Sequence, residues 1–255
     1  MKDLATTSGE SSPLGRTALV TGGNKGLGLE TCRALAMLGV TVLLASRDAE
    51  RGEQAAELLW GEGLDVHPVV LDVTRPAQMS ALAEHIRQRA GRLDVLVNNA
   101  GIMLPWDPWA PDADTLRRVY ETNVFGLVSV TGALLPLLRE ATAPRIVNVT
   151  STTSSLSLIS EPGSPLATDY ILAYASSKTA VNMITVQYAL AFARSPDWRH
   201  VKINAATPGF IATDLNGHTG PRTAAEGARV VADLATLPPD GPSGGFFNED
   251  GPLPW

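Results

Sequence analysis

The fold of this chain is decided by the stretch Thr17-Ala18-Leu19-Val20-Thr21-Gly22-Gly23-Asn24-Lys25-Gly26-Leu27-Gly28. It begins as a short apolar run, typical of a buried strand, and the run stops at a pair of glycines. Apolar side chains at helical spacing follow, and Gly39 ends that pattern. Where a strand, a glycine turn and a helix start meet, free N–H groups and the positive end of the helix dipole suit a pyrophosphate. Because the spacing Gly22-x-x-x-Gly26-x-Gly28 departs from the common dinucleotide fingerprint, a plain strand–helix turn is the alternative.

The composition describes a globular chain with a substantial core. Its 255 residues are 44% hydrophobic and 18% charged, which suits one large α/β domain. The net charge of −6 argues against binding to nucleic acid or to an acidic membrane surface. The single cysteine, Cys32, cannot form an internal disulfide, and the four histidines show no ligand spacing, so no metal site is predicted.

The amino-terminal stretch 1–15 mixes serine, threonine, glycine and charged residues without an apolar run. We interpret it as a flexible lead-in rather than a signal peptide or a membrane span. No linker or repeat divides the rest, so 16–255 is predicted to be one domain that holds both the dinucleotide site and the substrate cleft. Together these features predict a cytoplasmic protein.

Short apolar runs alternate with helical patterns along the chain. After the first strand and helix, strands are predicted at 40–46, 65–73, 93–101, 145–151, 201–207 and 245–248. Helices are predicted at 49–60, 77–89, 113–139, 170–195 and 224–237. The segment 152–169 is predicted to be irregular, and 217–221 to be a mobile loop. Successive strand–helix units with continuous apolar strands predict an α/β fold with a doubly wound, mostly parallel sheet and helices on both faces.

Polar residues stand out at the carboxyl ends of six predicted strands, where open α/β sheets bind their ligands. These residues are 22–28, Ser46, Arg47, Asp72, 98–101, Ser151 and 208–213. Their position predicts one shared binding site, although no single motif among them is specific.

The most informative pair is Tyr174 and Lys178, in the predicted helix 170–195. A spacing of four places both side chains on one helix face. A charge at ~4 Å and an effective dielectric of ~20 is worth ~4 kcal/mol, or ~3 pKa units, which would bring a tyrosine pKa of ~10 towards neutrality. Burial of the phenol would oppose this shift. Tyr174 is therefore a candidate acid or base, the alternative being a surface tyrosine beside a solvated lysine.

Taken together, these residues resemble the short-chain dehydrogenase/reductase family. The matching positions run in the family's order from about Gly15 to the carboxyl terminus, and six motifs in order are specific where each alone is weak. They are Thr21-Gly22-x-x-x-Gly26-x-Gly28, Asn98-Asn99-Ala100-Gly101, Asn123 within Glu121–Gly126, Ser151, Tyr174-x-x-x-Lys178 and Pro208-Gly209. The resemblance implies the Rossmann-type form of the predicted sheet.

The resemblance implies a role for each member of the catalytic set. Tyr174 would donate the proton in carbonyl reduction, and Ser151 would hydrogen-bond the substrate oxygen. Lys178 would hold the nicotinamide ribose and depress the pKa of Tyr174. Asn123 would support a water in the proton relay. The alternative is that Asn123 is only a polar residue at a kink in a long helix.

A dinucleotide site is implied as well. Residues 99–101 would line the adenosine ribose, Asp72 and Val73 the adenine, and 208–213 the nicotinamide amide. The full set of expected cofactor contacts is Gly22, Asn24, Lys25, Gly26, Leu27, Gly28, Ser46, Arg47, Asp72, Val73, Asn99, Ala100, Gly101, Tyr174, Lys178, Pro208, Gly209, Ile211 and Thr213.

Arg47 and Lys25 predict NADPH rather than NADH. An NAD site places a carboxylate about 20 residues beyond the glycines, where this chain has Ser46. Charge-assisted bonds from Arg47 and Lys25 to the additional phosphate would favour NADPH by about 10²- to 10⁴-fold. Alternatively, Arg47 pairs with Glu50 or Glu53 at the surface of the next helix.

The glycine turn and the tail 237–255 resemble the carbonyl reductase branch of the family. Ser151 and Tyr174 lie 23 positions apart, more than in most members. The additional residues, at about 158–170, are expected to border the substrate entrance.

We therefore interpret the protein as an NADPH-dependent enzyme that reduces a ketone or aldehyde to an alcohol. Ser151, Tyr174, Trp106 and Phe210 are the expected substrate contacts. The alternatives are NADP-dependent oxidation of an alcohol and a non-catalytic regulator that senses dinucleotide, which would need no proton donor. A homodimer or homotetramer formed through the helices of Asn123 and Tyr174 is the default assembly, and a monomer follows if the insertion covers that face.

Overall fold

The computed structural model describes residues 15–168 and 170–255, so the predicted lead-in lies outside the described residues apart from Gly15. The described chain folds around one eight-stranded sheet with the strand order β3-β2-β1-β4-β5-β6-β7-β8. The strands are β1 (Thr17–Thr21), β2 (Thr41–Ser46), β3 (Val66–Val70), β4 (Val95–Asn98), β5 (Arg145–Val149), β6 (Lys202–Ala206), β7 (Phe246–Asn248) and β8 (Gly251–Pro252).

Strands β1 to β7 pair in parallel, which confirms the predicted doubly wound sheet. Their apolar runs are continuous because helices cover both faces, and all five residues of β1 are buried. The short β8 was not expected from the sequence. It turns back against β7 in an antiparallel hairpin, with Phe247 opposite Pro252.

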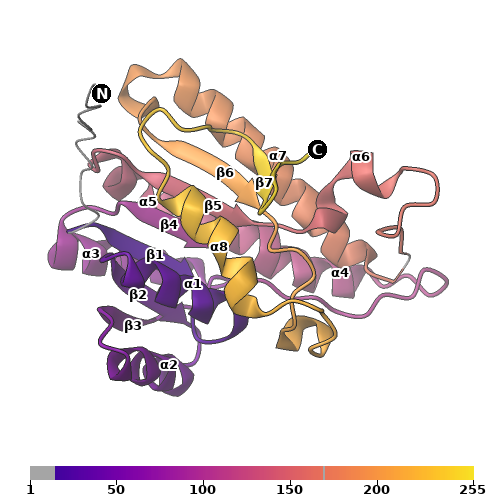
Figure 1. The fold of residues 1–255 in the computed structure, drawn as a ribbon, viewed down its shortest axis with the longest axis horizontal. Coiled ribbons are helices and arrows are strands. Elements are labelled where there is room, and N and C mark those ends of the chain that lie inside the picture. The colour runs from indigo at the N-terminus through magenta and orange to yellow at the C-terminus, as the bar shows by residue number, and fades with distance from the viewer. Residues whose placement is uncertain (1–14, 169) are drawn as a thin grey trace, which may run out of the picture.

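Two helical layers enclose the sheet (Figure 1). Helices α1, α2 and α8 pack on one face around Cys32 and Leu44, and α3, α5 and α7 pack on the other around Leu43 and Phe192. The longer helices are α1 (Gly26–Met37), α2 (Ala49–Gly61), α3 (Met79–Ala90), α4 (Ala113–Tyr120), α5 (Leu127–Arg139), α7 (Leu172–Arg194) and α8 (Ala224–Ala235). The shorter turns are η1 (Pro76–Gln78), η3 (Thr152–Ser154), α6 (Leu156–Ile159), η4 (Pro196–Trp198) and η5 (Asp214–Asn216).

The predicted helix 113–139 is continuous but changes its winding in the middle. Between α4 and α5 the segment η2 (Glu121–Gly126) forms a π-helical turn, which contains Asn123. By length and a mean hydropathy of 1.4, the stretch Ala113–Arg139 is able to cross a membrane, yet half of that apolar window is buried inside the fold. Core helices of globular domains have the same composition.

The predicted irregular segment 152–169 is partly helical, because Ser151 and Ser155 each begin a short turn. The Ser151 side chain caps η3 and the Ser155 side chain caps α6.

The topology fixes where a ligand can bind. Strand β1 lies between β2 and β4, so the chain leaves β1 towards one edge and returns from β3 to the other side. The chain thus changes direction between β1 and β4, and open α/β sheets bind their ligands at such a switch point, beyond the carboxyl ends of the strands.

Candidate active site

The loop after β1 forms an anion cradle at the start of α1. No side chain in the described chain caps that end of the helix, so its first N–H groups face outward. Gly28 is required here, because a Cβ at this position would collide with the carbonyl oxygen of Gly22. This backbone fits the pyrophosphate of a dinucleotide.

The loop after β4 holds the cradle in place. The Thr21 hydroxyl accepts hydrogen bonds from the backbone N–H groups of Asn99 and Ala100, both at 3.0 Å. In return, the Asn99 side-chain amide donates to the carbonyls of Thr21 at 2.8 Å and Gly22 at 3.1 Å. The Asn99 side chain thus supports the cradle, and Thr21, which the sequence placed in the glycine motif but not among the expected cofactor contacts, holds the two loops together.

Lys25 and Arg47, the two side chains expected to bind the additional phosphate of NADPH, differ in their surroundings. Lys25 forms an ion pair with Asp214 at 2.6 Å, which corrects the expectation that both cations are free to bind the additional phosphate. Arg47 is exposed and has no ion pair among the residues that the structure describes. The pairing of Arg47 with Glu50 or Glu53 is therefore not observed, and Ser46 is buried with its hydroxyl donating to Asp48 O at 2.8 Å.

A hollow of about 490 Å³ lies beside Arg47 at this edge of the sheet, lined also by Asp72 and Arg75. Burial of Asp72 tends to raise its pKa, but hydrogen bonds from Thr74 and the charges of both arginines hold the pKa below its usual value. An ionised Asp72 accepts hydrogen bonds, which suits the exocyclic amine of an adenine.

The proposed catalytic side chains meet where α7 crosses the end of β5. Lys178 lies one turn after Tyr174, and its Nζ is 5.8 Å from the centre of the Tyr174 ring. The same ammonium donates to the carbonyl of Val149, the last residue of β5, at 2.8 Å. Ser151 follows two residues later. Its hydroxyl is hydrogen-bonded with the Thr153 hydroxyl at 2.9 Å, and it lies close enough to the Tyr174 hydroxyl to lower the pKa of that group. The fold thus unites the predicted triad of Tyr174, Lys178 and Ser151.

Burial, rather than the lysine charge, governs the pKa of Tyr174. Burial raises this pKa to about 12, and the nearby Ser151 hydroxyl only partly opposes the shift. Burial also lowers the pKa of Lys178 to about 8. The expected shift of Tyr174 towards neutrality is therefore wrong for this structure, because the ammonium is directed to Val149 O rather than to the phenol oxygen.

Asn123 is almost fully buried and ties η2 to the loop after β4. Its amide accepts a hydrogen bond from Ile102 N at 2.8 Å and donates to Ile102 O at 3.0 Å. The same amide donates to the Ser177 hydroxyl at 2.9 Å. Asn123 therefore joins three elements beside Lys178, and its role in a water relay stays a prediction.

The loop after β6 reaches over the glycine turn. The methyl of Thr213 lies next to Gly26, and Arg222 fixes the loop by donating to Pro208 O at 3.0 Å. Arg222 also forms an ion pair with Glu249. The sequence carried no motif that marked Arg222, because its contacts are set by the fold.

Trp106 and Phe210, the aromatic residues expected at the substrate, are placed differently, and Trp109 lies near Trp106 in the same loop. Trp106 is half-buried, and its indole N–H finds no hydrogen-bond partner among the described residues. Trp109 is 90% exposed and Phe210 is 57% exposed. Of the three, Trp106 alone presents a buried donor.

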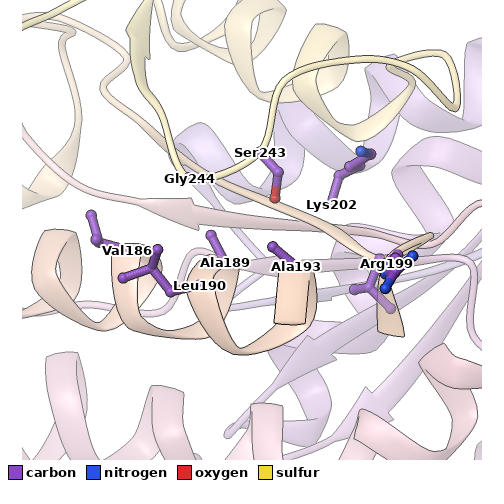
Figure 2. Close-up of a pocket in the computed structure, with 9 residues that line it drawn as sticks. Val186, Ala189, Leu190, Ala193, Arg199, Lys202, Ser243 and Gly244 are labelled. Atoms are coloured by element: carbon purple, nitrogen blue, oxygen red, sulfur yellow. The ribbon is translucent and has the colours of Figure 1, made fainter. Parts of the chain in front are cut away.

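A second hollow lies far from these residues. This groove has a volume of about 220 Å³. Figure 2 shows its lining residues, with Ala189 and Leu190 on α7 and Ser243 and Gly244 on the chain that passes over the helix. Lys202, the first residue of β6, also lines it, so this groove is at the amino ends of the strands, opposite the candidate active site.

The fold and site define an oxidoreductase of a known class, since the short chain dehydrogenase family model matches residues 16–224. The chain belongs to the short-chain dehydrogenase/reductase family and resembles its carbonyl reductase branch.

Its relatives include plant and animal enzymes. (+)-Neomenthol dehydrogenase of Capsicum annuum is 33% identical, with 91% of this chain and 95% of that protein covered. Carbonyl reductase [NADPH] 1 of Mus musculus is 32% identical, with 93% and 98% covered. The solved structure of salutaridine reductase from Papaver somniferum matches with a TM-score of 0.80 and 31% identity, covering 92% of this chain and 99% of that one.

Proposed function

We propose that this protein reduces a ketone or aldehyde to an alcohol with NADPH, using Tyr174 as the proton donor. The observation that carries the proposal is the placement of the buried Lys178 beside the Tyr174 ring at the end of β5, where Ser151 lies near enough to the Tyr174 hydroxyl to lower its pKa. A phenol with a pKa of about 12 keeps its proton throughout the physiological range, as an acid must. A relative named carbonyl reductase supports the substrate class.

In the proposed reduction, Ser151, Tyr174 and Lys178 have different roles. The bound dinucleotide would supply the hydride. Ser151 and Tyr174 donate hydrogen bonds to the substrate oxygen, and they stabilise the negative charge that develops there. Tyr174 Oη then transfers its proton to that oxygen. Lys178, with its ammonium at Val149 O, binds ribose hydroxyls from the floor of the site.

The preference for NADPH rests chiefly on Arg47. Ser46 replaces the carboxylate of an NAD site, and Arg47 is exposed beside the hollow that contains Asp72. Because Lys25 is engaged by Asp214, one arginine supplies most of the selectivity. A charge-assisted hydrogen bond contributes roughly 1.5–3 kcal/mol, which corresponds to about a 10- to 100-fold preference.

The decisive experiment follows NADPH absorbance with the purified protein and a panel of aldehydes, ketones, quinones and imines. Each active substrate is measured again with NADH, and both cofactors are compared in a Ser46→Asp, Arg47→Met variant. We expect wild-type kcat/KM to favour NADPH and the variant to lose that preference. Equal kcat/KM values for wild-type protein would contradict the cofactor assignment, and a panel without any reduced carbonyl would contradict the reaction.

Substrates with apolar or aromatic groups are proposed from Trp106, whose free indole N–H lies half-buried beyond the loop after β4. Phe210 lies on the loop that covers the glycine turn and offers an exposed ring. Both residues are proposed to contact the substrate.

We propose assembly into a dimer or tetramer through α4–α5 and α7. Apolar side chains are exposed on α5, α7 and the turn η2 that precedes α5: Phe125, Val128, Met183 and Leu190. Light scattering checks this directly against the 26.9 kDa mass of one chain. A monomer at micromolar concentration would contradict the assembly.

A further inference from the structure

The end of the chain is anchored on the last parallel strand. The ring of Trp255 stacks on Phe246 of β7, with ring centres 5.6 Å apart and planes 15° from parallel. Phe246 is 1% exposed, so Trp255 rests on the edge of the core. The backbone supports the same placement, because Leu253 N donates to Phe246 O at 2.7 Å. Residues 253–255 are therefore ordered by β7.

From this anchor, two backbone carbonyls reach the segment that follows the catalytic serine. Pro254 O accepts a hydrogen bond from the Ser155 hydroxyl at 2.8 Å, and Trp255 O accepts one from Ser157 N at 2.9 Å. Ser155 is fully buried, and its hydroxyl also accepts from Leu158 N at 3.1 Å, which starts α6. One serine thus joins the tail to the first turn of α6.

The segment held by the tail is connected to the catalytic residues at both ends. It begins at Ser151, which caps η3, and it leads into α7 just before Tyr174. Figure 1 shows the carboxyl terminus ending beside the chain that leads to α6. Within the described chain, none of the tail's hydrogen bonds reaches the glycine turn or Arg47. The tail therefore contacts the segment that connects Ser151 to α7, which the sequence leads us to expect at the substrate entrance.

We propose that Trp255 is a positioning residue for substrate selection. By stacking on Phe246 it presents two carbonyls that fix α6, and α6 forms the wall of the substrate entrance. In this position α6 would contact the part of a ketone or aldehyde that is remote from the reacting carbonyl. This inference rests on the proposed carbonyl reduction and adds a determinant that lies outside the motifs of the family.

The test compares Trp255→Ala with Trp255→Phe, which keeps a ring on Phe246. Trp60→Ala is the matched control, since Trp60 is a half-exposed tryptophan on α2, away from α6. We expect Trp255→Ala to change the ratio of kcat/KM between a bulky and a small ketone by about tenfold, mainly through KM, because without the ring stack the tail holds its two backbone oxygens less firmly against Ser155 and Ser157. The Kd for NADPH, measured by fluorescence, should stay at the wild-type value. Trp255→Phe should restore the ratio, and Trp60→Ala should leave it unchanged.

A backbone variant covers the case in which Trp255→Ala fails to fold. Ser157 is the second residue of α6, so its N–H has no partner within the helix and bonds to Trp255 O instead. Ser157→Pro removes that donor without losing a helical hydrogen bond, and it should shift the same ratio. An unchanged ratio in a folded Trp255→Ala or Ser157→Pro variant that binds NADPH normally would overturn this inference alone. A wild-type protein that reduces no carbonyl would overturn the proposed function as well.

Discussion

At the scale of single residues, burial acts in opposite directions on the two ionisable groups of the site. It raises the pKa of Tyr174 to about 12 and lowers the pKa of Lys178 to about 8. At neutral pH the phenol is therefore protonated and the ammonium is still charged. Both states are those that a proton donor beside a ribose-binding lysine requires.

Tyr174→Phe should lower kcat by about 10²- to 10⁴-fold, the usual contribution of a general acid, because it removes one hydroxyl and little else. The Kd for NADPH should change little. Stopped-flow reduction and fluorescence titration measure the two quantities. Tyr170→Phe is the control, since Tyr170 is exposed four residues earlier. A Tyr174→Phe variant that reduces carbonyls at the wild-type rate would show that the proton comes from another group.

The pH profile should report Lys178. Its pKa in the folded protein is lowered to about 8, so the charged form exists below that value and is lost as the pH rises through it. We expect kcat/KM for NADPH to be flat from about pH 6 to 7 and to decline above about pH 8. Tyr174 contributes no change over this interval, because its pKa is about 12.

Lys178→Arg provides the control for this profile, because a guanidinium keeps its charge over the whole interval. Its kcat/KM should be lower than wild type yet should not decline near pH 8. A wild-type profile that stays flat to pH 10 would contradict the role of the Lys178 charge.

At the scale of elements, the π-helical turn η2 matters because it brings Asn123 to the loop after β4. The turn also closely approaches Val73, in the loop after β3. A Cβ on Gly126 would lie 2.8 Å from Val73 Cγ2 and 3.0 Å from Val73 O. Since the backbone oxygen cannot move aside cheaply, Gly126 is fixed by packing.

Gly126→Ala should therefore destabilise the protein by about 1–3 kcal/mol through overpacking. Gly132→Ala is the matched control in α5, where the structure shows nothing within 4 Å of the added Cβ. It should stabilise the protein by about 0.5–1 kcal/mol, because alanine loses less backbone entropy in a helix. Urea unfolding midpoints measure both changes. Equal midpoints for the two variants would contradict the close approach of η2 to Val73.

At the scale of the whole molecule, one buried arginine connects distant parts of the chain. Arg145 begins β5 and is fully buried. Its guanidinium donates to Leu237 O at 2.7 and 2.9 Å and to Pro238 O at 2.7 Å. These carbonyls follow the end of α8, so Arg145 fixes the connection between α8 and the carboxyl-terminal strands.

Arg145→Met should cost about 2–4 kcal/mol of unfolding free energy, because the carbonyls of Leu237 and Pro238 lose their charged donor. Urea denaturation measures the loss. Arg199→Met, at an exposed position without an ion pair among the described residues, should have little effect. An Arg145→Met variant as stable as the wild type would mean that water replaces the guanidinium.

Much of the site could be predicted where the spacing is local. Tyr174 and Lys178 are one helical turn apart, and the observed helix places them on one face. Ser151 could be assigned because it ends a predicted strand, although the length and structure of 152–169 could not. The partners of Lys25 and Arg222 were beyond prediction, since Asp214 and Glu249 are distant in sequence and no pattern couples them.

By itself, the sequence determined the class of fold, the order of its elements and the positions at which polar residues interrupt them. These properties follow from hydrophobic periodicity and turn residues, which act over a few neighbouring positions. Only the tertiary structure decided which charges meet and how strongly each is desolvated. Lys25 binds Asp214, the Lys178 ammonium faces Val149 O, and burial sets the pKa of Tyr174. Such effects depend on the groups that folding packs together, and that arrangement is not written in any local stretch of the chain.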